Sequence, residues 1–328
     1  MTKYSDADEK YIEVSDLKQY YPIRRGVFRR AAGYVKAVDG VSFNIRRGET
    51  LGLVGESGCG KTTIGRTILH LIKPTSGDVK LMGEDVGRLA RDDNASLRRR
   101  MQIIFQDPYG SLNPKMTAQD IIGEAPRYHG VVSRRETAAY VCDMMERVGL
   151  RPESRAKYPH EFSGGQRQRI GIARVLAMKP EFVVCDEPVS ALDVSIQSQV
   201  LNLLADLRDE FSLTYLFISH DLSVVRHISD RVAVLYLGRL VEMAPKENFF
   251  ARPFHPYSRA LISAIPSTNP DAKKNRIVLE GDVPSPINPP RGCIFSTRCP
   301  QVRPMCVEKS PEMTDRGDGH LAACFFLD

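Results

Sequence analysis

The stretch Gly55–Thr62, GESGCGKT, has the residue types and spacing of a loop that holds phosphate groups. Its glycines let the backbone bend around an anion, so that successive N–H groups point inward. An apolar run precedes the loop and a segment with helical spacing follows it, and a helix N-terminus adds partial positive charge. Lys61 could reach the β- and γ-phosphates, and the Thr62 hydroxyl could ligate Mg²⁺. The residues expected to line this nucleotide site are Gly55, Glu56, Ser57, Gly58, Cys59, Gly60, Lys61, Thr62 and Thr63, and we assign Cys59 no chemistry.

Two carboxylates follow the apolar run in FVVCDE, residues 182–187. Asp186 is placed to associate with Mg²⁺ beside a phosphate-binding loop. Glu187 comes one residue later and could polarise a water in line with the γ-phosphate. The plainer alternative is a strand end with two solvated acids, which the complete phosphate loop disfavours.

A second glycine-rich stretch, FSGGQRQRI at residues 162–170, raises the question of why one chain needs two such loops. Its glycines would let backbone N–H groups approach a phosphate, and the helix that follows would present its positive end. The sequence therefore predicts two separate phosphate contacts.

The elements around these motifs indicate an α/β fold. Apolar strands alternate with amphipathic helices, which favours a mostly parallel sheet with helices on both faces. Residues 11–54 predict short strands, and residues 114–160 have helical periodicity without a strand, as expected for a helical insertion. After about residue 250 the sequence is rich in proline, which predicts an extended linker before a small cysteine-containing module.

Composition restricts the class of protein. The chain has 328 residues, of which 42% are hydrophobic and 26% charged, enough for a large core and two domains. No apolar run is long enough for a transmembrane helix, and the polar N-terminus, MTKYSDADEKY, lacks the apolar core of a secretory signal. We therefore expect a cytoplasmic chain. The basic segment 24–36 indicates a solvated loop or contact with acidic lipid head groups, and more weakly nucleic acid.

Five motifs in a fixed order resemble those of the ATP-binding subunits of ABC transporters. They are the phosphate loop, Gln106 in IIFQDP, Ser163–Gln166 with Phe162 where leucine is usual, Ser190–Asp193, and His220 in FISHD. The resemblance implies a P-loop ABC ATPase domain over residues 1–250, with a mostly parallel sheet core, an antiparallel β subdomain and a helical subdomain at about 108–172.

The resemblance also implies a role for each motif and answers the question about the second loop. Two ATPase domains pack head to tail, so that the first loop of one and SGGQ of the other enclose each ATP. Hydrolysis then releases the closed dimer, which makes ATP the ligand of a two-state switch. The residues implied are Ser163, Gly164, Gly165, Gln166 and Asp193 at the partner's ATP, Thr62, Gln106 and Asp186 at Mg²⁺, and Glu187, His220 and Gln106 in catalysis. Since none of these types is missing, we expect hydrolysis to be intact.

An aromatic side chain that stacks on adenine is expected in the first strand–turn–strand. Tyr21 and Tyr34 both qualify, and the basic insertion between them obscures the register. We favour Tyr21, with core packing as the alternative for either tyrosine.

Further segments resemble the oligopeptide/dipeptide importer branch. They are FQDPYGSLNPKM at 105–116, HPYSRALISAIP at 255–266 and the cysteine-containing tail, while RRGVFRR and VKAVDGVSF resemble the F-type subunit. Residues 251–328 would then be the C-terminal extension of this branch. Implied partners are a second ATPase of the D type or another copy, two transmembrane permease subunits and an extracytoplasmic solute-binding protein. The implied location is peripheral, on the cytoplasmic face of the inner or plasma membrane.

Cys293, Cys299, Cys306 and Cys324 crowd into the tail with spacing C-x5-C-x6-C-x17-C. Four thiolates can hold one [4Fe–4S] cluster or one Zn²⁺, and spacing alone does not choose. The resemblance favours the cluster, with zinc, free thiols or disulfides as alternatives. A metal would staple a module too small to bury much core.

The resemblance implies an ATP-hydrolysing motor subunit of an importer for peptides or related small solutes. Two other classes compete with this hypothesis. One is a soluble ABC ATPase that acts on nucleic acid or ribosomes, which usually has paired domains or long insertions. The other is a regulator that binds ATP without hydrolysis, which Glu187 and His220 argue against.

Overall fold

The computed structural model describes residues 10–25, 30–266 and 276–326. Outside them lie residues 1–9 of the polar N-terminus, 26–29 of the basic segment predicted to be a solvated loop or a lipid contact, and 267–275 of the predicted proline-rich linker. The chain divides into two compact units, Met1–Gly87 with Ile218–Asp328 and Arg88–Phe217.

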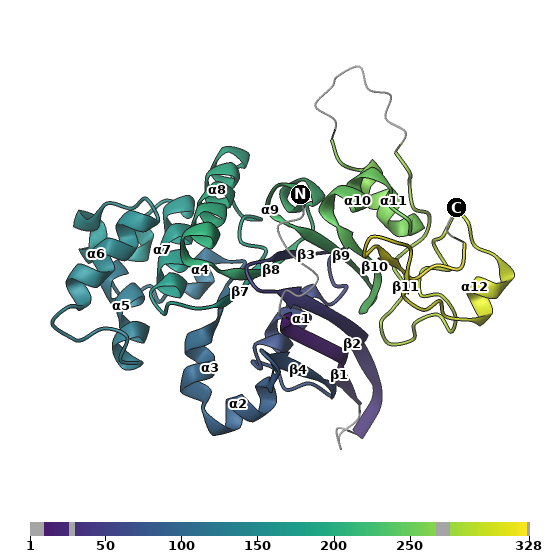
Figure 1. The fold of residues 1–328 in the computed structure, drawn as a ribbon, viewed down its shortest axis with the longest axis horizontal. Coiled ribbons are helices and arrows are strands. Elements are labelled where there is room, and N and C mark those ends of the chain that lie inside the picture. Colours follow the sequence, from purple (N-terminus) through teal and green to yellow (C-terminus); the bar gives the residue numbers. More distant parts are fainter. Residues whose placement is uncertain (1–9, 26–29, 267–275, 327–328) are drawn as a thin grey trace. The chain divides into compact units, whose positions relative to one another are not determined.

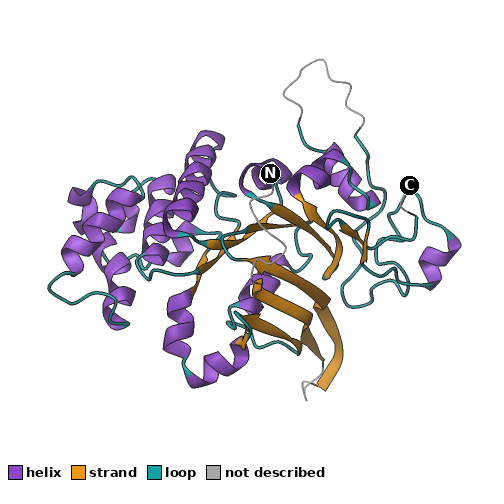
Figure 2. Cartoon of the chain, viewed as in Figure 1, coloured by secondary structure: helices purple, strands orange, loops and turns teal. Residues whose placement is uncertain are grey.

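The first unit contains an antiparallel sheet of strand order β2-β1-β4-β5, drawn in orange in Figure 2. Its strands are β1 (Lys10–Arg25), β2 (Arg30–Arg46), β4 (Ser76–Leu81) and β5 (Glu84–Asp85). The strands β1 and β2 are longer than the short strands predicted, because pairing continues outward to Arg25 and Arg30. The expected antiparallel β subdomain is therefore present.

The same unit holds a second set of strands with the order β11-β12-β10-β9-β3. These are β3 (Thr50–Val54), β9 (Arg231–Tyr236), β10 (Arg239–Pro245), β11 (Thr314–Asp315) and β12 (Leu321–Ala322). Every residue of β3 is buried, as predicted from its continuous apolar run, and β3 pairs in parallel with β9. The helices of this unit are labelled in Figure 1 and are α1 (Lys61–Ile68), α9 (Leu222–Ile228), α10 (Lys246–Ala251), α11 (Pro256–Ser263) and α12 (Pro304–Glu308).

A helix lies within residues 251–266, where the sequence predicted the start of an extended linker. The helix α11 forms in HPYSRALIS because Pro256 occupies its first turn, where a missing N–H costs nothing. Farther along, Leu321 and Ala322 pair with Met243 and Glu242 of β10. The C-terminal segment therefore contributes a strand to the sheet of the first unit.

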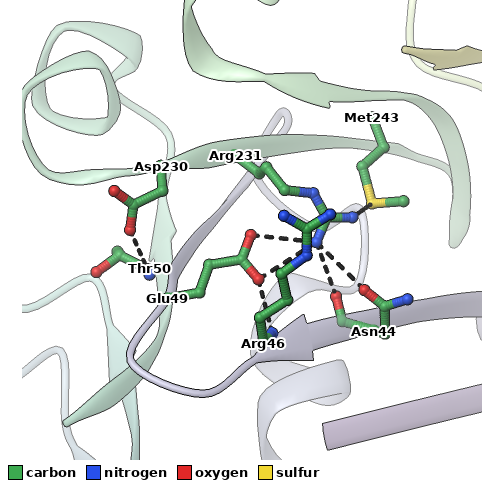
Figure 3. A network of polar contacts seen from close by, with 7 residues as sticks. All are labelled: Asn44, Arg46, Glu49, Thr50, Asp230, Arg231 and Met243. Carbon is green, nitrogen blue, oxygen red and sulfur yellow. Dashed lines mark hydrogen bonds and ion pairs between the residues drawn. The ribbon is translucent and has the colours of Figure 1, made fainter. Parts of the chain in front are cut away.

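A buried ion pair joins the turn before β3 to β9, as Figure 3 shows. The Arg231 Nη1 atom lies 3.1 Å from Glu49 Oε1, and Glu49 Oε2 accepts the Arg46 N–H at 2.7 Å. Asp230 accepts the Thr50 N–H at 2.8 Å. Burial raises the pKa of Glu49, and Arg231 opposes that shift. These contacts fix where β3 begins, and the phosphate loop follows β3 directly.

The second unit is mainly helical. It comprises α3 (Asn94–Arg100), β6 (Met101–Ile104), α4 (Pro108–Ser111), α5 (Ala118–Tyr128), α6 (Thr137–Arg147), η1 (Pro152–Ala156), η2 (Pro159–Glu161), α7 (Gly164–Leu176), β7 (Phe182–Asp186) and α8 (Val194–Phe211). Two elements cross the boundary between units along the chain, α2 (Val86–Asp92) and β8 (Thr214–Ser219). The strands β6 and β7 pair in parallel, and α5 packs against α6 and α7. Residues 114–160 contain helices and no strand, as predicted.

Candidate nucleotide-binding site

The phosphate loop lies between β3 and α1, the context that the sequence predicted. Gly55 and Gly60 have φ angles of 155° and 108°. A Cβ at Gly60 would lie 2.1 Å from the Ala37 carbonyl oxygen, and one at Gly55 would lie 2.2 Å from that of Leu235. Since both neighbours are backbone atoms that cannot yield cheaply, only glycine fits at these two positions.

Lys61, the first residue of α1, points its ammonium group into the loop. The Nζ atom donates to the carbonyl oxygens of Gly55 at 2.7 Å and Glu56 at 3.0 Å, and the side chain is buried. Thr62 and Thr63 follow in the first turn and are half-buried. The loop thus holds a cation at its centre, which suits an anionic ligand.

His220 belongs to the same unit and directly follows β8, where it is exposed. The next residue, Asp221, caps α9 by accepting the Ser223 N–H at 2.7 Å. This cap fixes the turn from strand to helix on which His220 lies.

The two candidate tyrosines lie on opposite faces of the β1–β2 pair. Tyr21 pairs with Val35, and Tyr34 pairs with Pro22, in a stretch without a register shift. Because side chains alternate between faces along a strand, these adjacent pairs face opposite ways. Tyr21 is 38% exposed and Tyr34 is 50% exposed. A nucleotide on one face can therefore stack on only one of them.

In the second unit, the acids of FVVCDE stand at the end of β7. Asp186 is buried and ends the strand, whereas Glu187 is half-buried with a left-handed φ of 46°. Gln106 Nε2 donates to Glu187 Oε2 at 2.9 Å. Sequence reasoning assigned both residues to the γ-phosphate but did not predict this bond, because they lie far apart in the chain.

The SGGQ stretch forms the start of α7 and leaves Ser163, Gly164 and Gln166 exposed. Ser163 Oγ accepts the Gln166 N–H at 3.3 Å, and Gln166 Oε1 accepts the Ser163 N–H at 3.0 Å. This reciprocal capping box fixes the helix start and places its positive end at the surface. Gly165 is buried instead, and a Cβ there would lie 2.6 Å from Ile196 Cγ2.

The stretch Ser190–Asp193 forms the turn between Glu187 and α8. Ser190 donates to the Glu187 carbonyl oxygen through its N–H at 3.3 Å and through its hydroxyl at 3.1 Å. Asp193 is exposed, and its carbonyl oxygen accepts the Gln197 N–H at 2.8 Å. The exposed Asp193 and the Glu187 backbone are thus linked through one short turn.

The four tail cysteines line a single pocket, which Phe295, Phe325 and Phe326 also border. The Cys293 N–H donates to the Cys306 carbonyl oxygen at 2.7 Å, which joins the two ends of the cysteine loop, residues 293–306. Burial raises the pKa of the Cys293 thiol to about 11, and it raises those of Cys299 and Cys324 as well. None of the four forms a disulfide.

Across the described part of the chain, no group of three or more His, Cys, Asp or Glu residues is spaced to hold a metal ion. The structure does not support the disulfide alternative. The arrangement of the cysteines does not support the cluster predicted from the resemblance. What the structure adds is that residues from three separate parts of the tail converge on one pocket.

No helix among the described residues is long and apolar enough to cross a membrane.

Two family models match parts of this chain, and curated proteins resemble it over most of its length. A family model described as ABC transporter matches residues 38–190, and one described as oligopeptide/dipeptide transporter, C-terminal region, matches residues 241–306. The oligopeptide transport ATP-binding protein AppF of Bacillus subtilis (strain 168) is 54% identical over 96% of this chain and 97% of its own. This chain belongs to the ATP-binding subunits of the oligopeptide/dipeptide ABC transporter family. A putative peptide import ATP-binding protein of Brucella ovis is 52% identical over 95% of this chain and 96% of its own.

Solved structures agree with the fold. The ATP-binding cassette MJ0796, described as a dimer in a post-hydrolysis state bound to ADP and Pi, has a TM-score of 0.64 and 27% identity, over 72% of this chain and 98% of its own. CbiO1 of Clostridium perfringens, part of the ABC transporter complex cbiONQ, has a TM-score of 0.62 and 27% identity, over 74% and 92%. The ABC ATPase fold class predicted from the motifs is therefore confirmed. As an ABC ATPase, the chain uses ATP and Mg²⁺.

Proposed function

We propose that this chain is the ATP-hydrolysing motor of an importer for peptides or related small solutes. The observations that carry the proposal are a phosphate loop with Lys61 at its centre and an exposed, capped SGGQ helix start, which we interpret as two half-sites. The relatives described as peptide import or oligopeptide transport proteins supply the substrate class.

In this proposal, ATP lies between the phosphate loop of one subunit and SGGQ of its partner. The dimeric state of the related cassette bound to ADP and Pi supports such packing. Ser163, Gly164, Gly165, Gln166 and Asp193 serve the nucleotide of the partner subunit. Closing the dimer then requires ATP, because neither half-site alone surrounds the γ-phosphate.

For catalysis we propose that Glu187 polarises the attacking water, with His220 and Gln106 assisting. Glu187 suits this role because the hydrogen bond from Gln106 orients its carboxylate. The Mg²⁺ ion would be held by Thr62, Gln106 and Asp186, whose hydroxyl, amide and carboxylate oxygens are the donors that this ion prefers. Bound Mg²⁺ would supply charge neutralisation at the β- and γ-phosphates.

We propose Tyr21 as the residue that stacks on adenine. The alternation of faces makes Tyr21 and Tyr34 mutually exclusive for one nucleotide. Tyr34 shares its face with Tyr20, whose hydroxyl is engaged with Asp39. This leaves the Tyr21 face as the better candidate for a ligand.

For domain organisation, we propose an ABC ATPase domain over residues 1–250, with a helical subdomain at about 108–172, and an importer-type extension over 251–328. The match of the transporter C-terminal model to residues 241–306 supports an extension of this kind.

The proposed partners are a D-type ATPase paralogue, two transmembrane permease subunits and, through them, an extracytoplasmic solute-binding protein. The proposed location is the cytoplasmic face of the inner or plasma membrane, as a peripheral subunit. Family membership supports a permease and a partner ATPase, and we propose a paralogue instead of a second copy because RRGVFRR and VKAVDGVSF resemble the F-type subunit.

Affinity purification of the tagged chain from detergent-solubilised membranes, followed by mass spectrometry, tests this proposal. We expect two multi-span proteins and a second ATPase, absent from a parallel preparation without the tag. Recovery of the chain only from the soluble fraction, alone or with nucleic acid, would contradict the transport function.

We further propose that the four tail cysteines hold a [4Fe–4S] cluster, with Zn²⁺ as the alternative. Four thiols that line one pocket are the donor set that either group needs. The choice of the cluster over zinc rests on the family resemblance, because spacing in the sequence does not distinguish the two. A bound group of either kind would stabilise the tail by joining its three segments.

The metal content of anaerobically purified protein decides between these groups. The cluster predicts about four iron and four sulfide per chain and absorption near 400 nm, which Cys306→Ser removes and Cys142→Ser, a cysteine on α6 outside the tail, leaves intact. Zinc without sulfide would select the alternative, and the absence of both metals would exclude either.

A further inference from the structure

Glu56 of the phosphate loop is held through its carbonyl oxygen, its N–H and its carboxylate. Its carbonyl oxygen accepts from Lys61 Nζ at 3.0 Å and from the Cys59 N–H at 3.3 Å. Its N–H donates to the Tyr257 hydroxyl at 2.9 Å, and its carboxylate pairs with Arg298. Two of these partners come from the C-terminal segment, Tyr257 from α11 and Arg298 from the cysteine-rich tail.

The pair between Glu56 and Arg298 is bidentate. Arg298 Nη1 lies 2.7 Å from Glu56 Oε2, and Nη2 lies 3.2 Å from Oε1. The Arg298 side chain is 8% exposed and that of Glu56 is 30% exposed. Such a fork of two parallel bonds fixes orientation as well as distance, and burial limits its screening by salt.

Arg298 is tied to the cysteines by position and by packing. It immediately precedes Cys299, and its N–H donates to the Phe295 carbonyl oxygen at 3.1 Å. Phe295 borders the pocket that the four cysteines line. A movement of the cysteine loop would therefore move Arg298.

An aromatic cluster forms a rigid base beneath this contact. The ring centroid of Phe295 lies 5.2 Å from that of Tyr236 and 5.4 Å from that of Tyr257, and Tyr236 and Tyr257 are 4.8 Å apart. All three side chains are fully buried. The tail is thus packed against the strand β9 and the helix α11. This packing holds the segment that carries Arg298 in position beside Glu56.

We propose that Arg298 is a positioning residue for the phosphate loop, so that the affinity for ATP depends on the state of the four tail cysteines. The loop must hold its N–H groups inward before nucleotide arrives, and a brace on Glu56 reduces the conformational freedom lost on binding. A cluster or zinc ion bound to the four cysteines keeps the tail ordered and Arg298 in place. Loss of that group releases the brace and weakens ATP binding. The dependence on the cysteines rests on the cluster or zinc proposed above, whereas the role of Arg298 does not.

Titration of the purified full-length chain with a fluorescent ATP analogue tests the brace. We expect Arg298→Gln to raise the Kd about 5- to 20-fold, with a matching rise in KM for ATP and little change in kcat, since Arg298 does not touch the reacting atoms. Arg298→Lys, which keeps the charge and loses the fork, should fall between. The control is Arg291→Gln, an exposed arginine of the same tail, which should bind like the parent chain.

A double-mutant cycle separates this role from simple damage to the fold. If Arg298 acts through Glu56, the double variant with Glu56→Gln should bind ATP no more weakly than the weaker single variant. Additive losses, or an Arg298→Gln chain with unchanged Kd, would overturn the proposal. Should Arg298→Gln fail to fold, the cycle with Arg298→Lys gives the same test.

The dependence on the cysteines is read in the same titration. Cys306→Ser should raise the Kd for ATP in the parent chain and cause no further rise in Arg298→Gln. If no metal is found in the parent chain, the proposed cluster fails while the cycle still judges the brace. If metal is present and its removal leaves the Kd unchanged, the dependence on the cysteines is wrong.

Discussion

At the residue scale, Glu187 combines an unusual backbone with a defined partner. A φ of 46° is uncommon for a residue other than glycine, and its cost persists only where the surroundings impose it. Here the end of β7 lies on one side, and two bonds from Ser190 to the Glu187 carbonyl lie on the other. The backbone therefore holds the carboxylate where Gln106 can orient it.

Glu187→Gln should stop turnover while ATP binding persists. The amide keeps the size of the side chain but cannot accept a proton, so kcat should fall about 100-fold or more. ATPase assays and gel filtration with ATP would check this, since trapped ATP should favour a dimer. Glu146→Gln, an exposed glutamate on α6, should retain activity. Rapid hydrolysis by the Glu187 variant would refute its role as the base.

At the element scale, the start of α7 must satisfy two demands at once. Its exposed side carries Ser163 and Gln166, and its other side packs against α8 through Gly165. The sequence shows the glycine pair but not that the two glycines differ. Gly164 has no neighbour nearer than 3.8 Å to an added Cβ, whereas Gly165 meets Ile196 at 2.6 Å.

Gly165→Ala should lower the free energy of unfolding by about 1–3 kcal/mol, because the methyl group overlaps Ile196 Cγ2. Denaturation followed by circular dichroism would measure this. Gly171→Ala in the same helix adds a methyl group to open space and should be neutral or stabilising. In a chain that already carries Ile196→Ala, Gly165→Ala should lower the free energy of unfolding by less than it does in the parent chain. An equal cost in both chains would argue against the overlap.

Another element-scale feature is the ion pair between Asp39 of β2 and Arg239 of β10. Arg239 Nη2 and Nε lie 2.7 and 3.0 Å from Asp39 Oδ2, and the Tyr20 hydroxyl donates to Asp39 Oδ1. Burial opposes ionisation of Asp39, but the hydrogen bonds from Tyr20 and Arg239 outweigh it and lower the pKa. Burial and the Asp39 contact raise the pKa of Tyr20 to about 12.

Because the pKa of Asp39 is lower in the folded chain, its stabilisation is present above the ordinary carboxyl pKa and is lost as pH falls through the folded value. Asp39→Asn should therefore destabilise the chain by about 1–2 kcal/mol at pH 7, and the difference should shrink as pH falls from 5 towards 3. Urea unfolding of both chains across this range would check it. A difference that is constant with pH would show that the charge of Asp39 is not the cause.

At the scale of the whole chain, the C-terminal strand β12 pairs with β10 in the sheet that also contains β3, and the phosphate loop directly follows β3. Glu242 on β10 is fully buried and accepts three bonds, from the Phe254 N–H at 2.7 Å, the His255 N–H at 2.8 Å and His320 Nε2 at 2.7 Å. One carboxylate therefore fixes both the start of α11 and the last turn of the tail.

Glu242→Ala should cost about 3 kcal/mol or more, since several buried donors lose their acceptor together. The tail should also become sensitive to limited proteolysis before the rest of the chain unfolds. Glu308→Gln, at an exposed position on α12, should leave both properties unchanged. If the Glu242 variant unfolds in one step with an intact tail, the carboxylate does not anchor the tail specifically.

The sequence by itself determined the family, the fold class and the order of the motifs. It could do so because a phosphate loop, a strand that ends in acids and a capped helix start are local patterns, legible within a few residues. Tertiary structure alone decided that Gln106 bonds to Glu187, that Tyr21 and Tyr34 face opposite ways, and that α11 replaces a linker. It also decided that Arg298, far along the chain, reaches Glu56. Such contacts depend on which segments the sheet brings together, and no local pattern records the partner of a side chain that lies hundreds of residues away.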